Sequence, residues 1–226
     1  MTFTEPKSTN DMVFANSTTE NLIDAILSGA YPFPSSGKSA LCLFGTYGTG
    51  KTTYANIFCD EFESARSGKK QAITPHFVSC QKTEGIDVIL KTCERLTKVI
   101  SFNESDYHYF IFDEVDNLTA GAQKALKTFL NKPNIVCILT TNYLDKLDKG
   151  LLNRCITVNF NAADPKDIRA RVQRILRDMG LAPLENDMID EVIQSSDGSW
   201  REIVPTVTFL AKQLPKPPNK PLRLVK

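Results

Sequence analysis

A glycine-rich octapeptide, G-T-Y-G-T-G-K-T at residues 45–52, separates a short apolar run from a segment that can form a helix. This pattern is typical of a loop whose backbone N–H groups cradle phosphates while its lysine reaches the β- and γ-phosphates. The run Ala40–Phe44 before it has the length and the uncharged composition of a buried strand. Glycine allows a tight turn around phosphates, and the helix that follows directs its positive dipole end at them. The octapeptide therefore predicts a nucleoside-triphosphate site between a strand and a helix.

The predicted nucleotide contacts come from the octapeptide and the residue after it. They are Gly45, Thr46, Tyr47, Gly48, Thr49, Gly50, Lys51, Thr52 and Thr53. A glycine-rich turn with a chance Lys-Thr pair is the alternative interpretation of these residues. We favour the phosphate loop because a strand pattern precedes it and a helix pattern follows it, as such a loop requires.

Length and composition bound the class of protein. The 226 residues are enough for one α/β domain and a small second unit. The formal net charge of +1 gives no overall attraction to nucleic acid, so DNA contact would need a local basic patch. We find no apolar run of membrane-spanning length and no signal-like N-terminus, and therefore expect a cytoplasmic or nuclear protein that is not secreted. The six scattered cysteines form no C-x-x-C pair, which favours buried thiols over zinc ligands.

Strand and helix patterns alternate through the first two thirds of the chain. Strands are expected at residues 40–44, 75–80, 107–112, 135–140 and 156–160. Such alternation implies an α/β fold, with a parallel sheet covered by helices on both faces. After Asn161 only helical patterns follow. The expected organisation is a flexible N-terminus (1–11), an α/β core (12–161), a helical unit (162–213) and a Pro- and Lys-rich tail without fixed structure (214–226).

Two adjacent acids, Asp113 and Glu114, follow the apolar run Tyr109–Phe112 at the end of an expected strand. Ligands of open α/β sheets bind at this edge, beside the phosphate loop. Magnesium that bridges phosphates takes oxygen ligands, and the hydroxyl of Thr52 and the carboxylate of Asp113 suit that role. Glu114 is then placed to orient or deprotonate an attacking water. A solvated acidic turn is the alternative.

Three further residues are candidates for a role in catalysis. Asn142 ends the fourth expected strand, where its amide could hold a water or touch the γ-phosphate. Arg154 precedes the fifth strand, and Arg201 lies near the start of a helix in the C-terminal unit. A turn-forming asparagine and two surface arginines are equally ordinary interpretations, so the residues alone leave these roles open.

Together these motifs resemble those of the AAA+ ATPases, and among them the small subunits of clamp loaders of the replication-factor-C kind. The resemblance covers about residues 10–212 and does not extend to the C-terminal helical collar of those subunits. The segments that carry it are Gly45–Thr52 (Walker A), Phe110–Asp116 (Walker B with its D-E-x-D extension), Leu118–Leu126 (L-T-x-x-A-Q-x-A-L), Thr140–Tyr143 (sensor 1), Leu151–Cys155 (S-R-C, with Asn153 for the serine) and residues 198–203 (sensor 2).

The resemblance implies an AAA+ phosphate-loop fold with a five-stranded parallel sheet in the order 5-1-4-3-2, followed by a small helical lid. It implies ATP and Mg²⁺ as cofactors, with Lys51 and Glu114 in the catalytic set. It further implies that Asn142 is sensor 1, that Arg154 is an arginine finger for a neighbour's nucleotide, and that Arg201 is sensor 2. The implied partners are a homo- or hetero-oligomer joined through Arg154, DNA, and a sliding clamp or other replication protein.

DNA contact is predicted at three lysines, Lys82, Lys124 and Lys127, for which plain solvation is the alternative. Our first functional hypothesis is an oligomeric, ATP-hydrolysing protein of clamp-loader type in DNA replication or repair. The second is an ATP-gated assembly protein that binds DNA or a partner and uses hydrolysis as a timer, as helicase loaders and transposition regulators do. A solitary small-molecule kinase would share the phosphate loop but would have no use for sensor 2.

Overall fold

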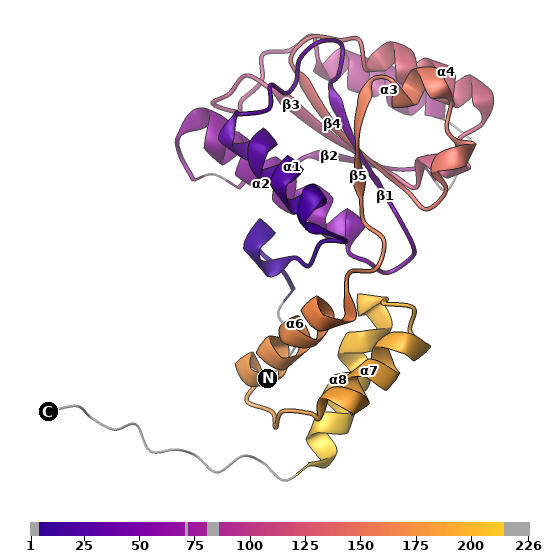
Figure 1. Cartoon of the computed structure of the whole chain (residues 1–226). Helices are drawn as coiled ribbons and strands as arrows, with labels where there is room; N and C mark the ends of the chain where they lie inside the picture. The colour runs from indigo at the N-terminus through magenta and orange to yellow at the C-terminus, as the bar shows by residue number, and fades with distance from the viewer. Residues whose placement is uncertain (1–4, 71, 81–85, 215–226) are drawn as a thin grey trace, which may run out of the picture. The chain divides into compact units, whose positions relative to one another are not determined.

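The computed structural model describes residues 5–70, 72–80 and 86–214. Its sheet has five strands in the order β2-β3-β4-β1-β5, and every neighbouring pair is parallel (Figure 1). The strands are β1 (Ala40–Phe44), β2 (His76–Ser79), β3 (His108–Asp113), β4 (Ile135–Thr141) and β5 (Cys155–Asn159). This confirms the predicted α/β class and the predicted strand order. The phosphate loop therefore leaves a strand that is paired on both sides.

Two layers of helices cover the sheet. On one face, α1 (Ser17–Ser28) and α2 (Lys51–Ser67) pack on a cluster that includes Leu41 and Leu43 of β1 (Figure 1). On the other face, α3 (Ile86–Leu96) and α4 (Ala120–Phe129) pack on a cluster that includes Ala40 and Cys42. Successive residues of a strand face opposite sides, so an uninterrupted apolar strand such as β1 is buried on both.

Residues Pro6–Ala162 form one compact unit, and the helices that follow Ala163 belong to another. The second unit contains α6 (Pro165–Asp178), α7 (Asn186–Ser195) and α8 (Trp200–Gln213). Each helix buries a stripe of aliphatic residues spaced by three or four positions, which is typical of a small bundle. The buried residues of these stripes include Ile168, Val172, Leu176, Ile189, Val192, Ile193, Ile203 and Val207. None of the described helices has both the length and the apolar character needed to cross a membrane.

The N-terminal segment differs from the flexible terminus that we predicted for residues 1–11. Residues Thr9–Asp11 form a short 3-10 helix, and Thr9 is buried. Its backbone N–H donates to Oε1 of Glu61 on α2 at 2.9 Å, and its hydroxyl donates to the other oxygen. Local polarity predicted disorder because it carries no sign of a partner so distant in sequence. Residues 1–4, and the tail beyond Leu214, lie outside the described residues.

The six cysteines are all buried and none forms a disulfide. Burial raises the pKa of the Cys80 thiol to about 12 and that of Cys93 to about 11. These groups therefore stay protonated near neutral pH, and protonated thiols are poor nucleophiles and poor metal ligands. Cys42 and Cys137, in the central strands, add small apolar volume to the core.

Gly45, the first residue after β1, passes very close to the chain that follows β5. A Cβ on Gly45 would lie 2.5 Å from the backbone nitrogen of Asn161 and closer still to the carbonyl carbon of Phe160. The N–H of Phe160 donates to the carbonyl of Phe44 at 2.6 Å, which holds the two segments together. Only glycine fits at this position, because backbone atoms cannot move aside as a side chain can.

We predict that Gly45→Ala lowers the free energy of unfolding by about 1–3 kcal/mol or more, because the added methyl group overpacks the backbone. Urea denaturation followed by circular dichroism measures the change. Gly121→Ala is the matched control, since the nearest atom to its Cβ is the Thr119 hydroxyl oxygen at 4.0 Å. The control should be neutral or slightly stabilising. Equal stability of the two variants would contradict the close approach.

Candidate nucleotide-binding site

The phosphate loop joins β1 to α2, whose first residue is Lys51. Gly50 precedes the helix with a φ of 95°, in the left-handed region that glycine adopts without strain. The loop is closed by two contacts: the Thr49 hydroxyl donates to the Thr46 carbonyl at 3.0 Å, and the Thr46 N–H donates to Oδ1 of Asn161 at 3.2 Å. The first N–H groups of α2 are thereby presented at the loop, as an anion-binding helix terminus requires.

The ammonium group of Lys51 is buried against the loop itself. Its Nζ donates to the Gly45 carbonyl at 2.9 Å and to the Thr46 carbonyl at 2.6 Å. The side chain thus spans the loop from the start of α2 back to the end of β1. An ammonium held in this position can bind phosphate oxygens that enter the loop.

Thr52 and Asp113, the two predicted magnesium ligands, lie side by side. The Thr52 hydroxyl donates to Oδ1 of Asp113 at 2.8 Å, although the residues are 61 positions apart. Asp113 is the last residue of β3, and Thr52 is in the first turn of α2. A hydroxyl and a carboxylate at this spacing are the hard oxygen donors that Mg²⁺ prefers, so the pair fits that ion.

Thr140, near the end of β4, connects the two acids of the site. Its hydroxyl donates to Oδ1 of Asp113 at 2.7 Å and accepts from the backbone N–H of Glu114 at 2.9 Å. The sensor 1 motif includes Thr140 but does not predict these contacts. Leu139 pairs with Phe112 in the parallel register, so the next residues of β4 and β3 meet at the edge. The predicted strand order makes β3 and β4 neighbours, but the sequence does not give the register that aligns Thr140 with Asp113.

Glu114, the first residue after β3, does not continue the extended backbone of the strand. Its φ of 58° and ψ of 51° lie in the left-handed region, which is uncommon for a residue other than glycine. Strained backbone of this kind occurs preferentially at functional sites. The carboxylate accepts from Nδ2 of Asn117 at 3.3 Å. The Asp113 carboxylate accepts from Thr52 and Thr140, whereas the Glu114 carboxylate accepts from Asn117, so the two adjacent acids can serve different roles.

Asp116 holds the segment that contains Asn142. Its Oδ1 accepts from the Thr141 hydroxyl at 2.7 Å and from the Asn142 N–H at 3.2 Å. The last acid of the D-E-x-D sequence therefore supports the end of β4 and is no part of the Thr52–Asp113 pair. Asn142 is half-buried at the same edge of the sheet.

Two exposed tyrosines join the phosphate loop to the end of β4. The Tyr47 hydroxyl donates to the Tyr143 hydroxyl at 3.0 Å, and their rings meet edge to face at 6.2 Å. This hydrogen bond is the main reason that the pKa of Tyr47 is raised to about 12. The Lys146 ammonium lies 3.9 Å from the centre of the Tyr143 ring, a cation–π arrangement. Sequence reasoning missed this pair because nothing in the local pattern relates the two segments.

Arg154 lies outside this cluster. It immediately precedes β5, at the amino end of that strand, whereas the phosphate loop and Asp113 are at carboxyl ends. In a parallel sheet these are opposite edges. Arg201 is an exposed residue in the first turn of α8, in the other compact unit. The structure thus brings together the phosphate loop, both acids and Asn142, but not Arg154.

The predicted DNA-contacting lysines differ in their surroundings. Lys124 is exposed on α4. The Lys127 ammonium forms an ion pair with Oδ1 of Asp148 at 3.2 Å, which partly neutralises its charge. Lys82 lies outside the described residues. The structure therefore favours Lys124 over Lys127 as a free cation for a phosphate backbone.

The fold and the site define a phosphate-loop protein of the α/β class. A family model described as "ATPase family associated with various cellular activities (AAA)" matches residues 41–162, more than half of the chain. The chain belongs to this AAA ATPase family.

Curated relatives confirm the resemblance to clamp-loader small subunits. The Replication factor C small subunit of Methanocella arvoryzae is 25% identical over 203 residues, covering 88% of this chain and 59% of the relative. Replication factor C small subunit 1 of Pyrobaculum arsenaticum is 24% identical over 201 residues, covering 88% of this chain and 57% of the relative. The chain thus spans a little over half of the length of these relatives.

Solved structures share the fold. The RuvB Holliday junction branch migration motor of Thermotoga maritima superposes with a TM-score of 0.66 at 18% identity, covering 90% of this chain and 63% of that chain. PCH-2 of C. elegans superposes with a TM-score of 0.62 at 14% identity, covering 92% of this chain and 65% of that chain. At these identities the likeness establishes the architecture alone.

We predict that Thr140→Val lowers the free energy of unfolding by about 1–3 kcal/mol, because the isosteric side chain leaves the partly buried Glu114 N–H without its acceptor. Thr140→Ser, which keeps the hydroxyl, should retain more of the stability. Urea denaturation of the three proteins measures the difference. If the valine variant proves at least as stable as the serine variant, the hydroxyl does not bridge the two acids.

Proposed function

We propose that this protein binds ATP with Mg²⁺ and hydrolyses it, as an oligomeric AAA+ protein of clamp-loader type that acts on DNA in replication or repair. The observation that carries the proposal is the hydrogen-bonded array of Thr52, Asp113, Thr140 and Glu114 beside the phosphate loop. It supports the proposal because it holds Thr52 beside Asp113 at the start of α2 and fixes the backbone of Glu114, and such groups can serve phosphoryl transfer to water. Such a protein would work in the cytoplasm, or in the nucleus of a eukaryote.

Each residue of the array has a distinct task in this proposal. Backbone N–H groups of the loop and the Lys51 ammonium bind the β- and γ-phosphates. Thr52 and Asp113 hold Mg²⁺, which when bound offsets negative charge on the phosphate oxygens. Glu114, which follows Asp113 and has a left-handed backbone, accepts a proton from the attacking water. Asn142, supported through Asp116, is placed to donate to the γ-phosphate.

Arg154 and Arg201 lie outside the array beside the phosphate loop, and each has a separate role in the proposed reaction. Arg154, at the opposite edge of the sheet, acts on the nucleotide of a neighbouring subunit, where a positive charge stabilises the transition state. Arg201 contacts the γ-phosphate of its own chain and relates the helical unit to the nucleotide state. Hydrolysis then depends on assembly, because the Arg154 that completes each nucleotide site comes from a neighbouring chain.

DNA and a sliding clamp, or another replication protein, are the proposed partners. Lys124 is the described lysine that we favour for DNA contact, and Lys82 is a further candidate. An ATP-gated assembly protein of the helicase-loader or transposition-regulator type would use the same nucleotide site. The two functions differ in the partner that stimulates hydrolysis, which makes them separable in solution.

For Glu114→Gln we predict retained ATP binding with hydrolysis reduced about 10²–10⁴-fold, since the amide cannot take up the proton. Titration with a fluorescent ATP analogue measures binding, and phosphate release measures turnover. Lys51→Ala is the contrasting variant and should lose binding itself. Unchanged turnover in Glu114→Gln would refute the water-activating role of this residue.

The clamp-loader assignment predicts that primed DNA together with a sliding clamp raises the rate of ATP hydrolysis more than primed DNA alone. The reason is that the transition state is completed only when subunits are aligned on both partners. Phosphate release measured with each partner, both, and neither provides the comparison. Full stimulation by DNA without any effect of the clamp favours the ATP-gated assembly protein.

A further inference from the structure

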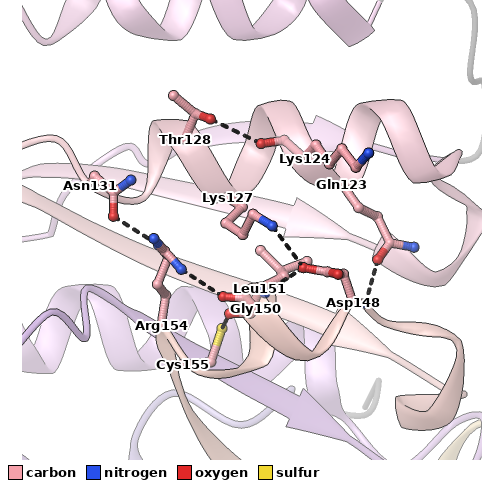
Figure 2. A network of polar contacts seen from close by, with 10 residues as sticks. All are labelled: Gln123, Lys124, Lys127, Thr128, Asn131, Asp148, Gly150, Leu151, Arg154 and Cys155. Atoms are coloured by element: carbon pink, nitrogen blue, oxygen red, sulfur yellow. Dashed lines mark hydrogen bonds and ion pairs between the residues drawn. The ribbon is translucent and has the colours of Figure 1, made fainter.

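The side chain of Arg154 is held in one orientation by two acceptors (Figure 2). Its Nε donates to Oδ1 of Asn131 at 2.8 Å, and its Nη1 donates to the Gly150 carbonyl at 2.8 Å. The backbone is fixed as well: the Arg154 N–H donates to the Leu151 carbonyl at 3.0 Å, and its own carbonyl accepts from Ser39 at 3.2 Å. A long side chain that normally samples many rotamers is thus pinned at both ends.

One line of residues along α4 and its last turn supports this arrangement. Gln123 and Lys127 lie on one face of α4, four positions apart, and Asn131 lies in the turn that follows the helix. Oε1 of Gln123 accepts from the Asp148 N–H at 2.7 Å, and the Lys127 ammonium pairs with Oδ1 of Asp148 (Figure 2). Asp148 caps α5 (Lys149–Leu152), the short helix before Arg154. Gln123 and Lys127 therefore hold α5 in place through Asp148, and Asn131 accepts from the Arg154 guanidinium.

Both groups that accept hydrogen bonds from Arg154 are neutral, so the guanidinium keeps its full positive charge. An amide oxygen and a backbone carbonyl orient the guanidinium without cancelling its charge, as a carboxylate would. None of the described carboxylates forms an ion pair with Arg154, and its Nη2 has no partner in the described part of the chain. Guanidinium offers five N–H donors, so Nη2 and the second hydrogen of Nη1 form an unused fork suited to a phosphate group.

We infer that Asn131 is a positioning residue that orients Arg154 so that its Nη2 edge meets the phosphates bound by a second copy of this chain. The inference rests on the proposed function, in which Arg154 acts across an interface. Asn131 does not touch the nucleotide; it fixes the plane of the group that does. Misplacement of such a group by about 1 Å can reduce a rate by about 10²-fold, so a single neutral hydrogen bond can control the activity of Arg154.

Mixing two inactive proteins tests this inference. One carries Glu114→Gln and supplies Arg154; the other carries Arg154→Ala and supplies Glu114. Their mixture should regain ATP hydrolysis, measured as phosphate release, because some interfaces then combine an intact site with an intact arginine. Asn131→Ala is added to one partner at a time. Urea denaturation verifies that each double variant is folded.

In the Glu114→Gln partner, Asn131→Ala should lower the regained rate by about 10-fold or more, since that chain donates the arginine. In the Arg154→Ala partner, which has no arginine to orient, it should change the rate by less than about twofold. Asn131→Asp in the Glu114→Gln partner keeps an acceptor oxygen but pairs the guanidinium with a carboxylate, so its regained rate should stay below that of the parent mixture. Equal losses in both partners overturn the positioning role. A parent mixture that regains nothing overturns the action of Arg154 across an interface, and the inference with it.

Discussion

The carboxylate of Asp113 accepts hydrogen bonds from two threonines that belong to different parts of the chain. Thr52 lies in the first turn of α2 and Thr140 near the end of β4, so one oxygen atom of Asp113 joins the phosphate loop to two adjacent strands. The hydroxyl of Thr140 then fixes the backbone of Glu114. The fold thus holds together the two proposed magnesium ligands, Thr52 and Asp113.

The parallel sheet also decides which residues cannot share a site. The phosphate loop, Asp113 and Asn142 meet at the carboxyl ends of strands, whereas Arg154 begins one. Arg154 thus lies at the opposite edge of the sheet from the phosphate loop of its own core. The proposed dependence of hydrolysis on assembly rests on this separation. The rigid support of Arg154 by α4 and α5 suits a group that must be presented to another molecule.

The parts of the site that are local in sequence were predicted correctly in kind. The octapeptide is a strand-to-helix loop, and Asp113 ends a strand, because apolar periodicity and glycine spacing are encoded within a few residues. Sheet order came from the family resemblance, since periodicity alone does not order parallel strands. The bond between Thr9 and Glu61 was missed, because the polar local sequence carries no sign of a partner 52 positions away. The Tyr47–Tyr143 bond was also missed, because nothing in the local sequence relates the two segments.

The sequence by itself determined the elements and the chemical groups that their ends carry, because hydrophobic spacing, glycine and helix caps act over one or two turns of chain. Only the tertiary structure decided which of these groups are neighbours. Thr140 is 27 positions from Asp113, and Asn131 is 23 positions from Arg154. Contacts across such separations depend on the order of strands and the placement of helices on the sheet. These are set by burial of the whole core and by no local pattern.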